Sequence, residues 1–580
     1  MNTFKRILLL SLLFSLFVFC LLAVMPTTYA MDTHIHNVTN YDELRNASFS
    51  SYWPVPANVV INLKNDIVIN TNDYEYFFNN VSRGGGLTFN NVTVTINGNG
   101  HNLIVNMSKG VYYPEFLNFE YCDVEINNLN IVNSNFTQLS GGNTISGSGG
   151  TYIRPNSVIG FVGINNSLTI RDCKLLNSTV GNRDFSFIGM NSRNDSNIVI
   201  ENVTISGNSV GRMVCFSYRS FYGDQYLEYP PAEINLKNIS IENNNLSWVI
   251  DSPNSVRFVV SEISIANNSF LGSGAVRITN ACDENEISNC SFVNNILYWE
   301  LVQFFGGEGS LLLKNSYFEN NTITSPRSFI LIGNGNVVHN TFVDNNINMS
   351  SGSAYFYGQT TNPKLIAFNT FVNNSFNDSL FFQSSVTAFG NLFVNSTIMA
   401  EASAVDNIYS NNYFEVFGTN VPALNGGKTK NIQLSDKETN PVLDKISVAD
   451  YQTKIGTNPN SDTDQTGKDR LYGSAVDYGS VEYQKGTIGT IIDDIIDIFK
   501  PSGNNSSLNK LNNSNLSDIG SNSGLFSKTK PSMEDFLFGN GSIIDRTSNL
   551  LYFITLNWVK LNVPIISPIS QGIINLAGWE

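Results

Sequence analysis

The sequence predicts an all-β chain built around a right-handed parallel β-helix, and three observations lead to this fold. A short pattern of apolar and polar residues recurs along the middle of the chain. The alternation inside each copy has the period of a β-strand with one buried face. Asparagine, which accepts the left-handed backbone of tight corners, makes up about one residue in seven.

Each copy of the pattern reads apolar-x-apolar, two polar residues, then apolar-x-apolar. Successive copies run over residues 168–175, 198–205, 234–241 and 258–265. Two adjacent polar residues shift the alternation by one step, which in a straight strand would turn the second apolar pair outward. The chain is therefore expected to bend at the polar pair, as it does at the corner of a solenoid coil.

The last apolar residue of each copy serves as an anchor for counting coils. The anchors recur about every 21–36 residues, which lies within the range of solenoid repeats. In the later copies the anchor is phenylalanine, and we expect these rings to form a column inside the solenoid. Stacked asparagines can also hydrogen-bond along the axis. The anchors are Leu175, Ile205, Ile241, Ile265, Phe292, Phe318, Phe342, Phe371, Phe393 and Phe414.

The N-terminus predicts export. Lys5 and Arg6 precede an apolar run over residues 7–24, and Pro26 and Ala30 follow, which is the order of a cleaved signal peptide. An uncleaved anchor is the alternative, because the run is about long enough to span a bilayer. The predicted organisation is a signal peptide (1–30), an N-terminal cap with the first strands (31–90), the β-helix (91–420), a last coil with a C-terminal cap (421–486) and a small, partly helical tail (487–580).

The tail combines a short amphipathic helix, an Asn/Ser-rich linker and an interrupted apolar end. A small packed tail is the favoured interpretation. A segment that lies on a membrane or binds a partner is the alternative.

The composition excludes some partners and gives no catalytic site. A net charge of −15 argues against nucleic acid and anionic membrane surfaces as partners. The acidic residues of the coils are scattered singly, whereas glycoside hydrolysis usually needs a pair of carboxylates. We therefore predict no catalytic residue, no cofactor and no bound metal.

Several residues that could carry chemistry have plainer structural interpretations. The strongest basic and acidic neighbourhood is Arg171, Asp172, Arg183 and Asp184, for which a solvated strand face is favoured. His34 and His36 alternate and could bind a metal, but a mobile N-terminus is favoured, and His101 belongs to a turn. Asn460, Asp462 and Asp464 resemble a calcium loop without its central glycine and distal glutamate.

The cysteines do not form a disulfide framework, because an odd number follows the signal peptide. Cys173 and Cys290 fall at the inward position that Val203 holds in another copy, so we expect small core residues there. A local bridge between Cys282 and Cys290 stays open. Glycosylation sequons are abundant, and some are expected to be modified if the chain is exported. They include Asn37, Asn91, Asn135, Asn202, Asn238, Asn267, Asn320 and Asn373.

Three features carry a family resemblance: the stretch Ile-Asn-Gly-Asn-Gly-His at residues 96–101, the repeated Phe-x-Asn-Asn turns, and the closing segment at residues 469–484. With these features, residues 55–485 resemble the right-handed β-helix adhesin-like proteins of archaeal methanogens. The closing segment is similar to the end of many secreted β-helix proteins. Members often carry a further attachment region, and no convincing one is evident here.

The resemblance implies an extracellular cell-surface protein, adhesin-like or structural, that binds glycans or surface proteins of other cells or of the cell envelope without catalysis. A polysaccharide lyase or glycoside hydrolase on a pectate-lyase-like β-helix is the alternative, because this fold hosts many such enzymes. The enzyme would show charged residues of adjacent coils converging on one sheet face, and the aligned copies show none. A passive wall component is a third, weaker interpretation.

Overall fold

The computed structural model divides the chain into Met1–Gln484 and Lys485–Glu580. All described residues belong to the first unit, and both the predicted signal peptide (1–30) and the predicted tail (487–580) lie outside the described residues. The structure describes residues 31–49, 57–70, 87–106, 115–137, 144–147, 150–153, 157–180, 185–193, 196–216, 232–252, 256–270, 273–281, 284–307, 309–324, 328–348, 354–357, 364–376, 380–382, 386–396, 406–436 and 439–484.

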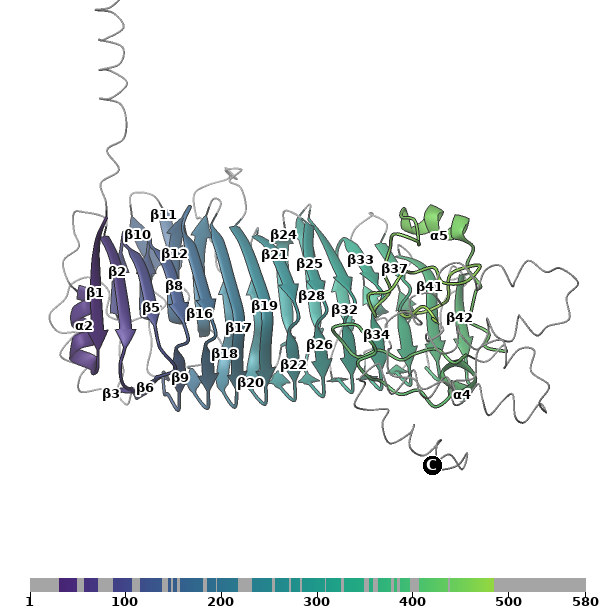
Figure 1. Cartoon of the computed structure of the whole chain (residues 1–580), viewed down its shortest axis with the longest axis horizontal. Coiled ribbons are helices and arrows are strands. Elements are labelled where there is room, and N and C mark those ends of the chain that lie inside the picture. Colours follow the sequence, from purple (N-terminus) through teal and green to yellow (C-terminus); the bar gives the residue numbers. More distant parts are fainter. Residues whose placement is uncertain are drawn as a thin grey trace, which may run out of the picture. The chain divides into compact units, whose positions relative to one another are not determined.

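The described strands form a parallel β-helix, as the repeat predicts. Equivalent strands of successive coils pair in parallel on three faces, and Figure 1 shows them side by side from β1 to β42. The first face contains β1 (Asp32–Val38), β2 (Ala57–Leu63), β5 (Thr93–Asn97), β8 (Asp123–Asn127), β13 (Ser167–Arg171), the start of β17 (Asn197–Ser206) and of β19 (Ala232–Glu242), β21 (Val256–Ser261), β25 (Glu284–Ser288), β29 (Ser310–Lys314), β33 (Gly335–Val338), β37 (Lys364–Ala367) and the start of β41 (Val386–Val394).

The second face contains the ends of β17, β19 and β41 together with β3 (Ile67–Asn70), β6 (Asn102–Asn106), β9 (Asn130–Val132), β14 (Lys174–Leu176), β22 (Ser264–Ala266), β26 (Ser291–Val293), β30 (Tyr317–Glu319), β34 (Thr341–Val343), β38 (Thr370–Val372) and β42 (Asp406–Ser410). The third face contains β4 (Leu87–Asn90), β7 (Glu115–Glu120), β12 (Ser157–Ile164), β15 (Thr179–Val180), β16 (Ser186–Arg193), β18 (Ser209–Phe216), β20 (Asn245–Ser252), β23 (Ser269–Phe270), β24 (Val276–Ala281), β27 (Ile296–Leu297), β28 (Val302–Gly307), β31 (Thr322–Ile323), β32 (Ile330–Ile332), β35 (Asn346–Ile347), β36 (Ala354–Tyr357), β39 (Ser375–Phe376) and β40 (Leu380–Phe382).

Few described elements lie outside these faces. A hairpin of β10 (Thr144–Gly147) and β11 (Gly150–Ile153) is antiparallel. Helix α2 (Tyr41–Phe49) packs beside β1 at the first coil and buries Tyr41, Leu44 and Ala47 there (Figure 1). Near the other end lie α4 (Tyr413–Phe417) and α5 (Val448–Ile455).

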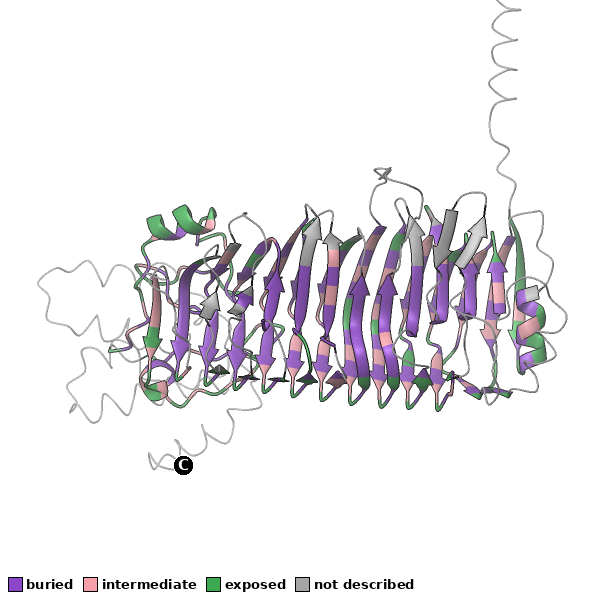
Figure 2. Cartoon of the chain, turned by 180° about the vertical axis from the view of Figure 1, so that it is seen from behind, coloured by how far each residue is buried: buried purple, intermediate pink, exposed green. Residues whose placement is uncertain are grey.

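The chain bends at the polar pair of each copy, as predicted. In β17, Ile200 and Val203 are both buried although they stand three residues apart, and Asn202 between them is exposed. Asn202 has a φ of 57°. This left-handed residue turns the strand so that both apolar pairs face the core, while Figure 2 shows exposed residues gathered at the turns. Asparagine accepts this backbone at low cost because its short polar side chain tolerates it.

Left-handed residues recur at two corners of the coil. The first corner joins the first and second faces, and the second corner joins the second and third. The first corner holds Asn128, Asp172, Asn202, Asn238, Glu262, Asn289, Asn315, His339 and Phe368, and the second holds Asn133, Asn177, Asn243, Asn267, Asn294, Asn320, Asp344, Asn373 and Asn395.

A buried asparagine follows the second corner in successive coils and forms an asparagine ladder along the axis. Asn295 is representative: its Nδ2 donates to Asn321 Oδ1 at 3.0 Å and to the carbonyl oxygen of Ile265 at 2.8 Å. Its Oδ1 accepts from the Nδ2 and the backbone N–H of Asn268, both at 3.1 Å. Each amide therefore satisfies its polar atoms within the core. The asparagine ladder contains Asn208, Asn244, Asn268, Asn295, Asn321, Asn345 and Asn374.

A phenylalanine stack runs parallel to the asparagine ladder. The ring centroids of Phe318 and Phe342 lie 4.5 Å apart with planes inclined by 8°, and those of Phe342 and Phe371 lie 4.7 Å apart. These separations match the spacing of adjacent strands, so each ring contacts its equivalent in the next coil. The complete stack is Phe292, Phe318, Phe342, Phe371, Phe393 and Tyr409.

The assignment of Phe414 as the last anchor is wrong. Phe414 lies in α4 and is 58% exposed, whereas Tyr409 of β42 stacks on Phe393 with a centroid distance of 4.8 Å. The sequence Tyr-Ser-Asn-Asn at residues 409–412 resembles the Phe-x-Asn-Asn turns of the earlier coils, but tyrosine replaces phenylalanine at the position that pairs with Phe393. A template that requires phenylalanine at this position does not include Tyr409.

Removing one amide from the middle of the asparagine ladder should destabilise the protein. Asn295→Ala removes the Nδ2 donor to Asn321 Oδ1 and to the Ile265 carbonyl, and it removes the oxygen that accepts from the backbone N–H and Nδ2 of Asn268, while the backbone N–H of residue 295 still donates to Asn321. We expect a loss of about 2–4 kcal/mol in the free energy of unfolding. Asn294→Gly, at the exposed left-handed residue before it, should change the value by less than about 0.5 kcal/mol. Denaturant unfolding of both variants makes the comparison, and equal losses would contradict the role of the ladder.

The phenylalanine stack predicts a second contrast in stability. Phe342→Ala removes a fully buried ring that stacks on two others and meets Phe329 and Phe356 edge-on, and it should cost about 3–5 kcal/mol. Phe414→Ala should cost less than about 1 kcal/mol, because that side chain is mostly exposed. Thermal unfolding of the two variants checks both the stack and the corrected position of its last member.

Candidate functional site

A group of buried polar side chains belongs to a C-terminal cap, which we define as residues 413–484. The cap lies against the outer side of the second face at the last coils. There it covers the outward side chains of Tyr317, Val343 and Val372 with Val416, Phe417, Ile432, Leu434 and Val442. This apolar layer is separate from the core inside the solenoid.

Hydrogen bonds fix the cap to the strands below it. Thr341 Oγ1 donates to Gln465 Oε1 at 2.5 Å and lies 2.8 Å from Ser480 Oγ. The backbone N–H of Ser480 donates to Thr370 Oγ1 at 2.9 Å. Thr341 and Thr370 occupy the outward position of β34 and β38, where earlier coils have Ser240 and Ser264 facing solvent. The threonines are buried because the cap covers them.

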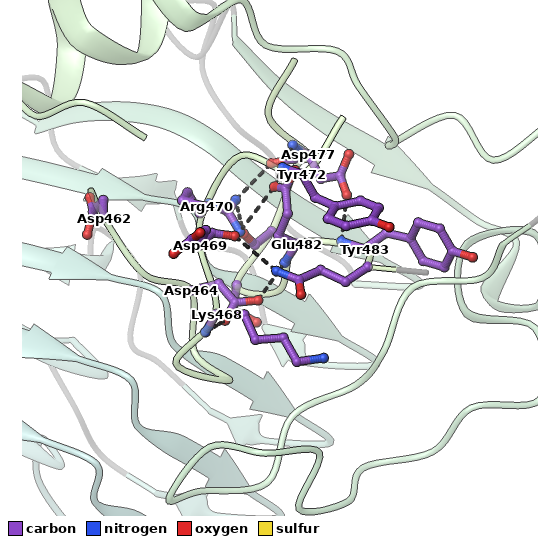
Figure 3. Close-up of polar contacts among 12 residues, drawn as sticks. Asp462, Asp464, Lys468, Asp469, Arg470, Tyr472, Asp477, Glu482 and Tyr483 are labelled. Atoms are coloured by element: carbon purple, nitrogen blue, oxygen red, sulfur yellow. Dashed lines mark hydrogen bonds and ion pairs between the residues drawn. The ribbon is translucent and has the colours of Figure 1, made fainter. Parts of the chain in front are cut away.

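The closing segment, which carries the family resemblance, folds into a clasp of Asp464, Arg470, Asp477 and Glu482 (Figure 3). Arg470 Nη2 donates to the carbonyl oxygens of Asp477 at 2.8 Å and Gly479 at 2.6 Å. Its guanidinium carbon lies 4.4 Å from the centroid of the Phe368 ring. The side chain of Arg470 is fully buried, so it ties the two ends of the segment together over the first corner.

Each of the three acids of the clasp accepts a hydrogen bond from the backbone N–H of another clasp acid or of the residue beside one. Asp464 Oδ2 accepts from the N–H of Glu482 at 2.8 Å, and Glu482 Oε2 accepts from the N–H of Asp477 at 3.0 Å. Asp477 Oδ2 accepts from the N–H of Tyr483 at 2.7 Å. The second oxygen of each acid also accepts a backbone N–H group. The donor is Thr466 for Asp464, Tyr472 for Glu482 and Asp444 for Asp477.

Burial raises the pKa values of two carboxyl groups in the clasp. Desolvation raises the pKa of Glu482 to about 8 and that of Asp477 to about 6, against the opposing attraction of Arg470. Every carboxyl oxygen of the three acids already accepts a backbone N–H group, and the three acids are buried. We therefore interpret the clasp as a structural fastening and not as a site that handles a substrate.

A second charged group lies on the outer side of the third face. This arginine cluster contains Arg212, Trp248, Asp251 and Arg277. Asp251 Oδ2 lies 2.7 Å from Arg212 Nε, and Oδ1 lies 2.6 Å from Arg277 Nη2. The guanidinium carbon of Arg277 lies 4.8 Å from the Trp248 ring centroid. The carboxylate is 2% exposed and the Arg277 side chain 28%, so solvent reaches the arginine but hardly reaches the acid.

The register places the arginine cluster on adjacent coils. Cys215, Asp251, Arg277 and Gln303 occupy one outward row of β18, β20, β24 and β28. Gln303 also hydrogen-bonds the carboxylate of Glu300. Sequence comparison of the copies missed this convergence because it aligned the first two faces. On the third face the strands differ in length from coil to coil, so their register could not be read from a fixed template.

The residues considered from the sequence have structural contacts. Arg171 forms ion pairs with Glu201 at 3.3 Å and Glu125 at 3.7 Å on the neighbouring coils, which is the solvated strand face that was favoured. Asp172 accepts a hydrogen bond from Asn202, whereas residues 183 and 184 lie outside the described part of the chain.

The four histidines all lie in the described part of the chain. His34 and His36 lie in β1, in contrast to the mobile terminus that was favoured. His101, between β5 and β6, has its Nδ1 3.5 Å from Oδ1 of Asp66 on the neighbouring coil. His339 is buried under the cap, and desolvation lowers its pKa to about 3, so it is neutral.

The described cysteines and the acids of the apparent calcium loop have structural roles. Cys173 and Cys290 are buried free thiols of the core, and burial raises the pKa of Cys173 to about 11. Cys282, the other member of the suggested bridge, lies outside the described residues. Asp464 belongs to the clasp, and Asp462 Oδ2 accepts from the hydroxyl of Tyr451 at 2.5 Å.

Among the described residues, no three His, Cys, Asp or Glu side chains gather in a way that could hold a metal ion. In the same part of the chain, no helix has the length and apolar character needed to cross a membrane. Comparison with models of protein families, with curated proteins and with solved structures finds no match to this chain.

The pKa of Glu482 predicts how stability depends on pH. An acid with a higher pKa in the folded state holds its proton more tightly when folded, so stability is greatest below the unfolded pKa and falls as pH rises toward the folded pKa. For Asp477 and Glu482 this window runs from about pH 4 to about pH 8. Each group contributes at most about 1.4 kcal/mol per pH unit.

Glu482→Gln should remove most of the decline between pH 6 and 8, because the amide cannot ionise. Asp469→Asn, at an exposed acid of the same segment, should leave the decline unchanged. Thermal unfolding and the protease resistance of residues 413–484 across this pH range provide the measurement. If the stability lost by the wild type between pH 6 and 8 equals that lost by Glu482→Gln, Glu482 is already ionised in the folded protein at pH 6.

Proposed function

We propose that this protein is an extracellular surface protein, adhesin-like or structural, that contacts glycans or surface proteins without catalysing a reaction. The leader-like N-terminus, the abundant sequons and the resemblance to adhesin-like β-helix proteins support location outside the cell. The parallel β-helix supports a role in display, because stacked coils give a long regular surface.

We propose a role without catalysis because acids of the described coils are held in ion pairs with basic side chains. Both oxygens of Asp251 are ion-paired with arginines, and several charged residues of the first face pair between neighbouring coils. Examples are Arg257 with Glu233 at 3.1 Å and Lys314 with Glu286 at 3.3 Å. A hydrolase would need two acids with separate roles, one to donate a proton and one to act as base or nucleophile.

The arginine cluster is the candidate contact for a glycan. Guanidinium groups present several N–H donors in a fixed plane, which suits hydroxyl and carboxylate oxygens of sugars. Arg277 is held in place by Asp251 and Trp248 and still reaches solvent. The same convergence of charge on one sheet face is the observation that favours the second candidate, a polysaccharide lyase or glycoside hydrolase.

Binding of the purified full-length chain to a glycan array and to intact cells tests the proposal. We expect binding to acidic glycans, and we expect Arg277→Gln to weaken it at least about tenfold, which corresponds to about 1.4 kcal/mol. The control is Arg257→Gln, which removes another arginine paired with an acid on the coil surface. Release of reducing ends or unsaturated sugars from polysaccharides would overturn the non-catalytic assignment. Lack of binding to any glycan or cell would favour a passive wall component.

A further inference from the structure

The coil geometry separates the asparagines that a glycan could reach from those that it could not. An acceptor for N-linked glycosylation is asparagine followed two positions later by serine or threonine. Residues two apart along a strand face the same side. Each buried member of the asparagine ladder is therefore followed by an inward apolar residue, as Asn268 is by Phe270 and Asn295 by Leu297. The asparagine ladder thus contains no acceptor, and acceptors in this region face outward.

From Asn267 to Asn373 the second corner carries acceptors on alternate coils, and outside this set Asn177 and Asn395 are further acceptors, Asn395 on the coil next to Asn373. Its left-handed residues in five successive coils are Asn267, Asn294, Asn320, Asp344 and Asn373. Two positions further, in register across the third face, the chain has Ser269, Ile296, Thr322, Asn346 and Ser375. Only the first, third and fifth coils of this set therefore combine an asparagine with a hydroxyl residue. Those three asparagines are exposed.

The alternation matches the space that a sugar needs. Neighbouring strands are about 4.8 Å apart, so alternate coils are about 9.6 Å apart. A sugar ring is wider than the spacing of one coil. A row with a glycan on every coil would crowd, whereas a row on every second coil leaves room for each. A glycan on Asn373 should therefore exclude one on Asn395 of the next coil.

The existing hydrogen bonds tolerate the modification. Asn320 Nδ2 donates to Asn294 Oδ1 at 2.9 Å, and Asn294 Nδ2 donates to Asn267 Oδ1 at 3.1 Å. A glycan replaces one of the two hydrogens on an asparagine Nδ2, so Asn320 keeps one hydrogen for Asn294. Asn267 takes part through its oxygen alone and is not disturbed.

We propose that Asn267, Asn320 and Asn373 carry N-linked glycans that form a row along the second corner. The proposal rests on the extracellular assignment made above. In the reaction, the anomeric carbon of a lipid-linked glycosyl phosphate forms a bond to Nδ2 while its bond to the phosphate oxygen breaks. Nδ2 loses one proton, and the lipid phosphate leaves.

Glycopeptide mass spectrometry of the full-length protein, isolated from the cells that export it, tests the proposal. The peptides that contain the three asparagines should carry glycans. Ser269→Ala, Thr322→Ala and Ser375→Ala should each remove one glycan and leave the others, while Thr322→Ser should retain it. Each substitution lies at an outward position, and circular dichroism should show unchanged strand content.

Ile296→Thr is the matched control for spacing, because it creates an acceptor at Asn294 between two occupied coils. We expect little modification of Asn294 while Asn267 and Asn320 are modified, and increased modification in a variant that combines Ile296→Thr with Ser269→Ala and Thr322→Ala. Full occupancy of all three neighbouring corners would overturn the spacing argument. Exported protein with unmodified peptides would overturn the glycan row and leave the surface assignment standing, whereas protein that is never exported would overturn both.

Discussion

The left-handed residue at the corner is the constraint on which the rest of the solenoid depends. Without it, the two polar residues between apolar pairs would send Val203 outward, since alternation along a strand is strict. With Asn202 at a φ of 57°, Ile200 and Val203 both reach the core. The same device recurs at the second corner, so each coil can close around one apolar interior. The high asparagine content follows from this requirement.

Once the corners repeat, the coils can stack in register, and equivalent side chains meet at the strand spacing. That repetition converts isolated residues into columns. A single buried asparagine would be costly, because its amide would lack partners in an apolar core. In the asparagine ladder each amide finds its acceptor one coil away, as Asn295 does at Asn321. The phenylalanine stack arises from the same register. A solenoid of this kind is therefore stabilised by contacts between neighbours, and no coil is complete alone.

The parts that the sequence predicts well are those governed by this local rule. The bend at the polar pair, the inward cysteines and the column of phenylalanines follow from a template of eight residues. The arginine cluster does not, because it depends on the register of third-face strands whose connecting segments vary in length. The clasp illustrates a different difficulty. Its sequence marks it as distinctive, but Asp464, Asp477 and Glu482 are satisfied by backbone N–H groups. Composition alone does not distinguish such acids from ligands for a metal.

The first corner also shows where tertiary packing overrides the local rule. His339 and Phe368 have φ values of 55° and 52°, although a left-handed backbone costs a side chain of this kind roughly 1–2 kcal/mol. Phe368 packs against Tyr451 of α5, with centroids 5.1 Å apart, and lies beneath the Arg470 guanidinium. Complete burial of a phenylalanine contributes about 1.5–3 kcal/mol, which offsets the strain. His339 is neutral, so it adds no second charge beside Arg470. His339 and Phe368 thus replace asparagine at this corner in two of the coils that the cap covers, and Phe368 couples the closing segment to the backbone geometry of the solenoid beneath it.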